Sequence, residues 1–335
     1  MGSAMQEMVA TGITARQFHE QILPGAHPIV LRGLVTHWPA VTAGRTSPAA
    51  LADYLRRFDR GAGVRAMFAP PRMKGRFFYN DDASGFAFRS DTVKLSAALD
   101  LLLTTAGDAR PQGIAIQSVP VADNLTGFDR ENRLALLPGG IDPRVWIGNA
   151  VTIAAHYDPS ENIACVVGGR RRFTLFPPDQ VGNLYPGPFE LTPAGPIISM
   201  VDFDAPDMAR FPGFATAMDH ALVADLEPGD AIYIPYLWWH HVRSIDTFNM
   251  LVNYWWAPRG HGNAVPTEAL LHAMMAIRTL PPAHRAAERA LFEHFVFGEG
   301  AGAHLPEERR GVQGQQDEGA ARKMRGDLAR SLARP

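Results

Sequence analysis

Cysteine is almost absent from this chain of 335 residues, because Cys165 is the single one. One cysteine cannot close an internal disulfide, and such sparse use of cysteine is typical of a reducing compartment. Cys165 lies within an apolar run, where a lone cysteine most often behaves as a small buried hydrophobic residue. We therefore predict a packing role for this residue and a cytoplasmic location for the protein.

Long hydrophobic runs are missing as well. No stretch reaches the length of about 18 consecutive apolar residues that a membrane-spanning helix needs. The opening MGSAMQEMVATG also lacks the basic segment and the apolar run of a secretory signal. The sequence thus predicts no membrane partner.

Neither sign of charge is in large excess, since 32 Lys and Arg stand against 34 Asp and Glu, for a formal net charge of -2. This balance gives no indication of a polyanionic partner, so we expect no nucleic-acid binding unless a local basic patch supports it. Hydrophobic residues, by contrast, make up 46% of the chain. That share is enough to build one large domain, or a main domain with a small satellite.

Short β-runs fill the region between about residues 145 and 257, where Pro, Gly and Asp clusters separate them. No helix of any length interrupts these runs, and strands at this spacing are typical of an antiparallel sandwich or barrel. The predicted fold class is therefore mainly β. Apolar residues at helical spacing predict helices on either side of this region, over 13–23, 48–59, 91–105, 266–280 and 283–297.

These patterns divide the chain into four parts. We predict N-terminal helices and strands that pack on a barrel, then the barrel itself, a helical pair, and a mobile tail poor in apolar residues. Their expected ranges, in that order, are 1–110, 111–260, 261–298 and 299–335.

The stretch HYD is the strongest local motif, with His156 and Asp158 two positions apart in an apolar β-run. A strand repeats every two residues, so both side chains are expected on one face, where they can converge on a cation. A neutral nitrogen from another strand would complete the set of two histidines and one carboxylate that leaves open positions on Fe(II).

The stretch WWHHVRSID offers that nitrogen. Alternation groups His240 with Val242, and His241 with Arg243. An arginine is not expected to point into a small barrel, so the face that carries Val242 is the inner one. We predict that His240 is the third ligand and that His241 points away. Taken alone, any of these histidines could equally be a hydrogen-bonded structural residue.

The arginine run GGRRRFTLF follows a predicted strand, and we expect a hairpin at Gly168 and Gly169. Alternation places Arg171, but neither neighbouring arginine, on the face of Phe173. A guanidinium inside a barrel needs an anionic partner, and no protein carboxylate is obviously placed to serve. The pattern therefore favours an anionic ligand held by a bidentate fork, and the alternative is a group of surface arginines at a hairpin tip.

Other polar and aromatic residues are less decisive. Asn162 and Asn253 lie in strands that are apolar on both faces, so alternation does not decide between a pocket residue and a strand-edge amide. Trp255 is as readily a core residue as a contact surface, and Tyr79 can be a turn residue.

At these residues the chain resembles a known family. HYDPSENIACVVGGRRRFTLFPPDQ, VDFDAPDMARFPGF and PGDAIYIPYLWWHHVRSID followed by NMLVNYWW are similar to the cupin-like JmjC oxygenases, in particular the asparaginyl hydroxylase that inhibits hypoxia-inducible factor. A weaker similarity extends to PIVLRGLVTHWPA and RFFYNDD. The resemblance implies a double-stranded β-helix, or jelly roll, with flanking N-terminal α/β elements and with C-terminal helices that pair two subunits into a homodimer.

The resemblance also implies a chemistry. Fe(II) would be held by His156, Asp158 and His240, and 2-oxoglutarate would chelate it, with O2 as cosubstrate. Arg171 stands where the family has a basic residue for the distal carboxylate, which is lysine in the hydroxylase named above. Asn162 and Asn253 match positions near the cosubstrate, Trp255 one that lines the pocket, and Tyr79 one in the active site.

The chain departs from the family pattern at two places. Ile153 replaces a hydroxyl-bearing residue, and the strand IAIQSV lacks a tyrosine that helps to hold the distal carboxylate. The segment 201–214 is expected either to border the substrate groove or to form a structural flap. The expected activity is hydroxylation of a protein side chain. The alternatives are an RNA base or a small molecule as substrate, or a non-catalytic metal-binding cupin-like module.

Overall fold

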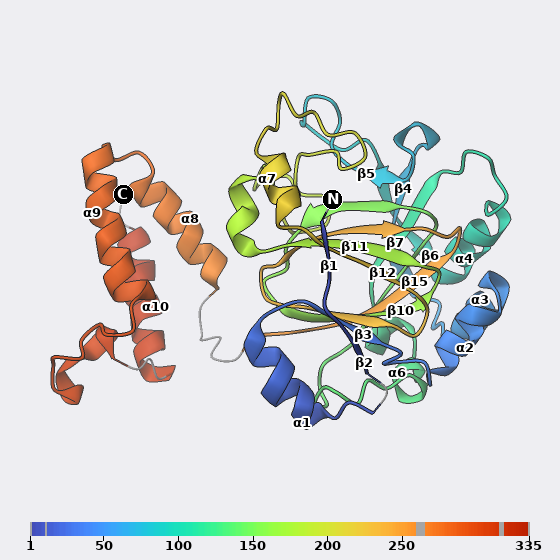
Figure 1. Cartoon of the computed structure of the whole chain (residues 1–335), viewed down its shortest axis with the longest axis horizontal. Helices are drawn as coiled ribbons and strands as arrows, with labels where there is room; N and C mark the ends of the chain where they lie inside the picture. The colour runs from blue at the N-terminus through green and yellow to red at the C-terminus, as the bar shows by residue number, and fades with distance from the viewer. Residues whose placement is uncertain (1, 11, 259–264, 315–317, 334–335) are drawn as a thin grey trace. The chain divides into compact units, whose positions relative to one another are not determined.

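The chain forms two compact units, residues 1–258 and residues 259–335. The computed structural model describes residues 2–10, 12–258, 265–314 and 318–333. Within these ranges no helix combines the length and the apolar character that crossing a membrane requires. Strands dominate the first unit (Figure 1).

Two β-sheets build the described part of the first unit. The strands of the smaller sheet are β1 (Ser3–Ala4), β5 (Arg76–Phe77), β9 (Thr152–His156), β11 (Arg171–Phe176), β12 (Leu222–Leu226) and β14 (Trp239–Ser244). Those of the larger sheet are β2 (Glu7–Val9), β3 (Ile29–Arg32), β4 (Gly63–Ala69), β6 (Arg89–Lys94), β7 (Gly113–Pro120), β8 (Arg144–Gly148), β10 (Glu161–Gly168), β13 (Ala231–Ile234) and β15 (Asn249–Trp256). Their spatial orders are β1-β12-β11-β14-β9-β5 and β2-β3-β13-β10-β15-β8-β7-β4-β6.

Strand alternation lets the larger sheet pack on both of its faces. Along β10, Ala164 and Val166 belong to a core shared with Phe173 of the smaller sheet. Ile163 and Cys165 belong to a second core on the opposite face. Because both faces are covered, every residue of β10 is buried, and Cys165 has the packing role that the sequence predicts.

Helices cover the second core. α2 packs against β10 and beside α3 (Figure 1). The start of α3 is set locally, because the Ser47 hydroxyl accepts a hydrogen bond from the Ala50 backbone N–H at 3.1 Å and Pro48 suits the first turn. The helices of this unit are α1 (Ala15–Gln17), α2 (Pro39–Thr46), α3 (Pro48–Arg56), α4 (Leu95–Thr104), α5 (Val121–Asn124), α6 (Phe128–Glu131) and α7 (Phe214–Asp219).

The predicted hairpin at Gly168 and Gly169 is wrong. β10 pairs with β13 and β15, whereas β11 pairs with β12 and β14, so this turn carries the chain from one sheet to the other. Gly169 has a φ of 68°, and a Cβ there would lie 2.3 Å from Asn249 Oδ1. Both facts require glycine at this position. The crossing between sheets is characteristic of a jelly roll.

A second correction concerns the predicted helix over 91–105. The helix begins only at Leu95, because residues 89–94 form β6 and pair with β4 at the edge of the larger sheet. For these residues the pairing with β4 outweighs the helical spacing of the segment that follows.

The second unit contains α8 (Pro266–Ile277), α9 (Pro282–Phe292) and α10 (Glu318–Leu332). The first two correspond to the predicted helical pair, with Pro281 preceding α9. α10 lies in the segment for which the composition predicts a mobile tail. The four-part division of the chain stays a prediction.

Candidate metal centre and its cavity

Two histidines from neighbouring strands face each other between the sheets. His156 ends β9, and His240 lies directly opposite it on β14, with 4.2 Å between the ring centroids. His240 is buried, and His156 is partly buried. Val242, two residues after His240, packs in the core between the sheets. His240 therefore points inward, on the face that the sequence predicts.

Asp158 joins the histidines from a turn rather than from the strand where the sequence placed it. β9 ends at His156, and the Leu237 backbone N–H donates to the Asp158 carbonyl at 3.1 Å. The carboxylate Oδ2 lies 3.6 Å from His240 Nε2 and is buried without a hydrogen-bond partner. One ligand atom from each of the three residues lies within 4.8 Å of the others. The turn thus produces the convergence that strand alternation was expected to produce.

Backbone carbonyls orient both imidazoles. Nδ1 of His156 lies 2.9 Å from the carbonyl of Ala154, and Nδ1 of His240 lies 3.1 Å from that of Trp238. A carbonyl only accepts, so each Nδ1 carries the proton and each Nε2 keeps a lone pair for the site. Burial, together with the nearby His156, lowers the pKa of His240 to about 4. This imidazole is therefore neutral near pH 7, as a metal ligand must be.

The donor set fits Fe(II). Two neutral imidazoles and one carboxylate form the facial set that leaves open positions on non-haem Fe(II). The unpartnered Oδ2 of Asp158 is a buried anionic atom that calls for a cation. Within the described ranges, this is the one cluster of three or more His, Cys, Asp or Glu side chains whose ligand atoms lie close enough for a metal ion.

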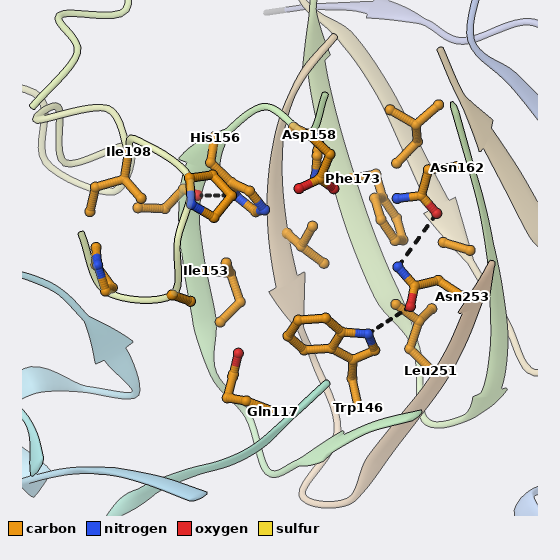
Figure 2. Close-up of a pocket in the computed structure, with 18 of the residues that line it drawn as sticks. Gln117, Trp146, Ile153, His156, Asp158, Asn162, Phe173, Ile198, Leu251 and Asn253 are labelled. Carbon is orange, nitrogen blue, oxygen red and sulfur yellow. Dashed lines mark hydrogen bonds and ion pairs between the residues drawn. The ribbon is translucent and has the colours of Figure 1, made fainter. Parts of the chain in front are cut away.

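A cavity of about 130 Å³ opens beside the three ligands. Its lining is mostly apolar, and neither Ser, Thr nor Tyr contributes to it. Figure 2 shows Asp158, Asn162 and Asn253 around one space, with Ile153 and Trp146 along its wall. The cavity thus combines three candidate metal ligands with a wall that carries few polar groups.

Arg171 brings a positive charge into this cavity. It starts β11 and is only 6% exposed, whereas the next residue, Arg172, is exposed and pairs with Asp225. Among the described residues no carboxylate pairs with the Arg171 guanidinium, and its Nε is buried without a partner. Burial lowers the pKa of Arg171 to about 10, so it stays charged near pH 7. A buried, unpaired guanidinium is costly unless an anion binds beside it.

The two asparagines that the sequence left undecided both line the cavity. They lie on the adjacent strands β10 and β15, where Nδ2 of Asn253 is 3.5 Å from Oδ1 of Asn162. Trp146 of β8, which sequence reasoning did not single out, donates its Nε1–H to Oδ1 of Asn253 at 2.7 Å. Trp255 lines the cavity as well, and its Nε1 is buried with no partner.

Tyr79 is not brought to the cavity. Its hydroxyl donates to the backbone carbonyl of Leu191, and its ring stacks on Phe86. Ile153, which replaces a hydroxyl-bearing residue of the family, does line the cavity. So does Gln117 of β7, which sequence reasoning missed, although a lone amide in an apolar strand was the available signal.

Residues from 193–198 line one side of the cavity, whereas the segment 201–214, expected either to border the substrate groove or to form a structural flap, contributes no lining residue. Phe203 stacks on His241 with 4.4 Å between ring centroids, and Asp204 pairs with Arg243. His241 points away from the cavity, as predicted, but this segment covers it. Its side chain is therefore buried and not solvated.

The burial of His241 predicts an acid-sensitive fold. Burial, together with the nearby Arg243 and Arg76, lowers the pKa of His241 from 6.5 to about 3. As the pH falls below about 6.5, the unfolded chain takes up a proton that the folded chain does not, so stability declines towards pH 3 and is unaffected above 6.5. We expect the free energy of unfolding of the metal-free protein, from urea denaturation, to fall over this range. For the variant His241→Gln, the free energy of unfolding should fall less steeply with decreasing pH. Equal slopes for the variant and the wild type would contradict the assignment of this acid sensitivity to His241.

The two facing sheets, with a cluster of two histidines and one carboxylate between them, define a jelly-roll protein of the cupin type with a metal site. The chain belongs to the family described as the cupin-like domain, which matches residues 15–261. The predicted jelly-roll fold class is thereby confirmed.

Similar proteins include a Jumonji C domain-containing protein, HSPB1-associated proteins and lysine-specific demethylases. The chain is 36% identical to Jumonji C domain-containing protein 5 of Drosophila melanogaster over 120 residues, which are 36% of this chain and 28% of that protein. It is 36% identical to HSPB1-associated protein 1 of Homo sapiens over 120 residues, 35% of this chain and 24% of the relative. With lysine-specific demethylase 8 of Xenopus tropicalis it shares 31% identity over 250 residues, 72% of this chain and 50% of the relative.

The chain therefore spans half or less of the length of these relatives. The predicted resemblance to cupin-like JmjC proteins is confirmed by the family match and by these similarities.

Proposed function

We propose that this protein is an Fe(II)- and 2-oxoglutarate-dependent hydroxylase. One observation carries the proposal: a single cavity holds both the cluster of His156, Asp158 and His240 and the unpaired buried guanidinium of Arg171. 2-Oxoglutarate matches both features, because its keto-acid end can chelate a metal and its distal carboxylate can accept from a guanidinium fork. When bound, Fe(II) and 2-oxoglutarate supply the activation of O2, with decarboxylation to succinate.

The chain's own residues hold and orient the reactants. The histidines contribute their Nε2 atoms, with each ring oriented by a backbone carbonyl, and Asp158 offsets part of the metal charge. Arg171 anchors the far end of the cosubstrate, which sets its position relative to the three ligands. The mostly apolar wall limits the access of water to the reacting centre.

Hydroxylation suits the cavity better than removal of methyl groups from lysine, the activity that the names of several relatives state. Asp158 is the one carboxylate among the lining residues, and it belongs to the metal centre, while Arg171 adds positive charge. A methylammonium group would enter without a free counter-charge, which is costly in a cavity of few polar groups. We infer that the substrate offers an uncharged C–H group, on a protein side chain or on a small molecule.

The release of succinate tests this proposal. The protein, supplied with Fe(II), ascorbate, 2-oxoglutarate and O2, should form succinate even without its substrate, through slow uncoupled turnover. Succinate is measured against samples that lack Fe(II) or contain a chelator, and both should be inactive. Binding of the metal without any succinate would contradict the proposal and support the alternative, a non-catalytic metal-binding cupin-like module.

We also propose that the protein is a cytoplasmic homodimer that pairs through its C-terminal helices. Large apolar side chains of α8 and of the segment that follows α9 are exposed, among them Leu270, Leu271, Met275 and Phe295. Exposed apolar groups of this size are typical of an interface. The proposed cytoplasmic location is supported by the single buried cysteine, because sparse use of cysteine is typical of a reducing compartment. Sedimentation velocity should show a dimer that Leu271→Asp weakens, and a monomer at all concentrations would contradict the pairing.

A further inference from the structure

A chain of three polar side chains crosses the wall of the cavity from one strand to the next. β8, β15 and β10 are neighbours in the larger sheet, and Trp146, Asn253 and Asn162 come from them in that order. In register, Trp146 is opposite Leu251, and Asn162 is opposite Trp255. Asn253 lies midway between these two partners on β15, so the three side chains form a diagonal line (Figure 2).

The hydrogen bonds of this line determine which way each amide points. An indole N–H can only donate, so the Trp146 contact of 2.7 Å must end on the carbonyl oxygen of Asn253. The amide nitrogen of Asn253 then faces Asn162 at 3.5 Å, where it needs the carbonyl oxygen as acceptor. Asn162 is left with its amide nitrogen, which Figure 2 shows on the side of Asp158. The indole N–H of Trp146 thus determines how the side-chain amides of both asparagines are oriented.

This line directs donors towards the cavity, and the carbonyl or carboxylate acceptors among the other lining side chains belong to Asp158, at the metal centre, and to Gln117 of β7. Each asparagine oxygen accepts one hydrogen bond within the line, and Asn162 and Asn253 are only 4% and 3% exposed. The unpartnered Nε1 of Trp255 and Nε of Arg171 are donors as well. Hydroxyl groups, which could rotate to donate or to accept, are absent from the lining.

We propose that Trp146 is a positioning residue that makes this wall specific for a ligand with acceptors only. The dianion of 2-oxoglutarate is such a ligand, since its carboxylates and keto oxygen all accept. An analogue that carries a donor in place of one acceptor would bring two donors together and leave a buried group unpaired, which weakens binding. The inference rests on the proposed function, because it takes 2-oxoglutarate as the ligand.

The variant Trp146→Phe tests the inference, since it keeps an aromatic ring but removes the N–H. Binding of 2-oxoglutarate to the Mn(II)-loaded protein is measured by calorimetry, beside two analogues. In 2-hydroxyglutarate a hydroxyl that can donate as well as accept replaces the keto oxygen, and in 2-oxoglutaramate an amide nitrogen that only donates replaces a carboxylate oxygen. The loss of one neutral hydrogen bond should weaken 2-oxoglutarate by about 3- to 10-fold. The preference for 2-oxoglutarate over at least one analogue should fall by a similar factor, because Asn253 can then turn its oxygen towards the cavity.

Trp256→Phe is the matched control. Trp256 is the next residue on β15 after Trp255 and packs against the core on the other face of the sheet. Because this variant loses an indole N–H away from the cavity, both the affinity for 2-oxoglutarate and the preference over the analogues should be unchanged.

Should Trp146→Phe fail to fold, Asn253→Asp serves instead, because a carboxylate can accept from Trp146 and also from Asn162. Asn162 would then turn its oxygen to the cavity, and the preference should shift towards the donor-bearing analogue.

The outcomes are distinct. Unchanged preferences for both analogues in Trp146→Phe, with or without a change in affinity for 2-oxoglutarate, would overturn the inference and leave Trp146 a packing residue. If the Mn(II)-loaded wild-type protein binds no 2-oxoglutarate, the proposed function itself has failed. A reduced preference in Trp146→Phe, with Trp256→Phe like the wild type, supports the inference.

Discussion

His240→Ala should abolish Fe(II)-dependent turnover of 2-oxoglutarate, whereas His241→Ala should keep at least part of it. His240 directs Nε2 towards Asp158 and His156, and no other described nitrogen is placed to replace it. Loss of a group that merely supports a metal ligand costs about 10- to 100-fold in metal affinity or activity. Removal of a ligand should therefore lower turnover by more than about 100-fold.

The adjacent histidine is the natural control for this experiment. His241 stacks on Phe203 on the outer side of β14, so its loss should reduce stability and leave the donor set intact. Succinate release and the stoichiometry of bound Fe(II) are measured for both variants, with thermal melting to follow the fold. An inactive His241→Ala that is still folded, beside an active His240→Ala, would reverse the assignment of the two faces.

Arg171→Ala is expected to raise the 2-oxoglutarate concentration needed for half-maximal turnover by about 100-fold or more, with Fe(II) binding unchanged. The guanidinium is buried without a protein counter-charge, so a carboxylate bound there gains hydrogen bonds to a charged donor. Such bonds contribute about 1.5–3 kcal/mol each, and a bidentate fork makes two of them.

Two further variants sharpen this prediction. Arg171→Lys keeps the charge and loses the fork, so it should lie between the wild type and Arg171→Ala. Arg172→Ala removes the neighbouring arginine, which is exposed and paired with Asp225, and it should behave like the wild type. If Arg171→Ala needs no more 2-oxoglutarate than Arg172→Ala does, another group anchors the cosubstrate.

Alternation along single strands predicted which way most side chains of the candidate site face. It separated His240 from His241, and Arg171 from Arg172, because in each pair one partner shares its face with an apolar residue and the other does not. The structure brings the predicted ligands within 4.8 Å of one another and buries Arg171 in the same cavity. Alternation failed at Asp158, which reaches the site from a turn after the strand has ended.

Pairing between strands could not be predicted in the same way. The run from β10 through Gly168 and Gly169 to β11 has the composition of a hairpin, yet the two strands belong to different sheets. The requirement for Gly169 comes from Asn249, about 80 residues further along the sequence. Such a contact is set by the tertiary fold and leaves no local signal.

Residues that act through the cavity wall were missed for a related reason. Trp146 and Gln117 each have unremarkable neighbours in the sequence, and their importance depends on which strands lie beside theirs. Tyr79 is the opposite case, because the family resemblance placed it in the active site, while its hydroxyl bonds to the Leu191 carbonyl outside the cavity.

Anaerobic titration of the Fe(II)-loaded protein with 2-oxoglutarate tests the central claim most directly, because it reads the metal, the cosubstrate and their contact together. The proposed site predicts a visible metal-to-ligand charge-transfer band that saturates at one 2-oxoglutarate per chain, is absent in His240→Ala, and needs far more 2-oxoglutarate in Arg171→Ala. Fe(II) that binds to the wild-type protein without giving this band at any concentration of 2-oxoglutarate would contradict the claim.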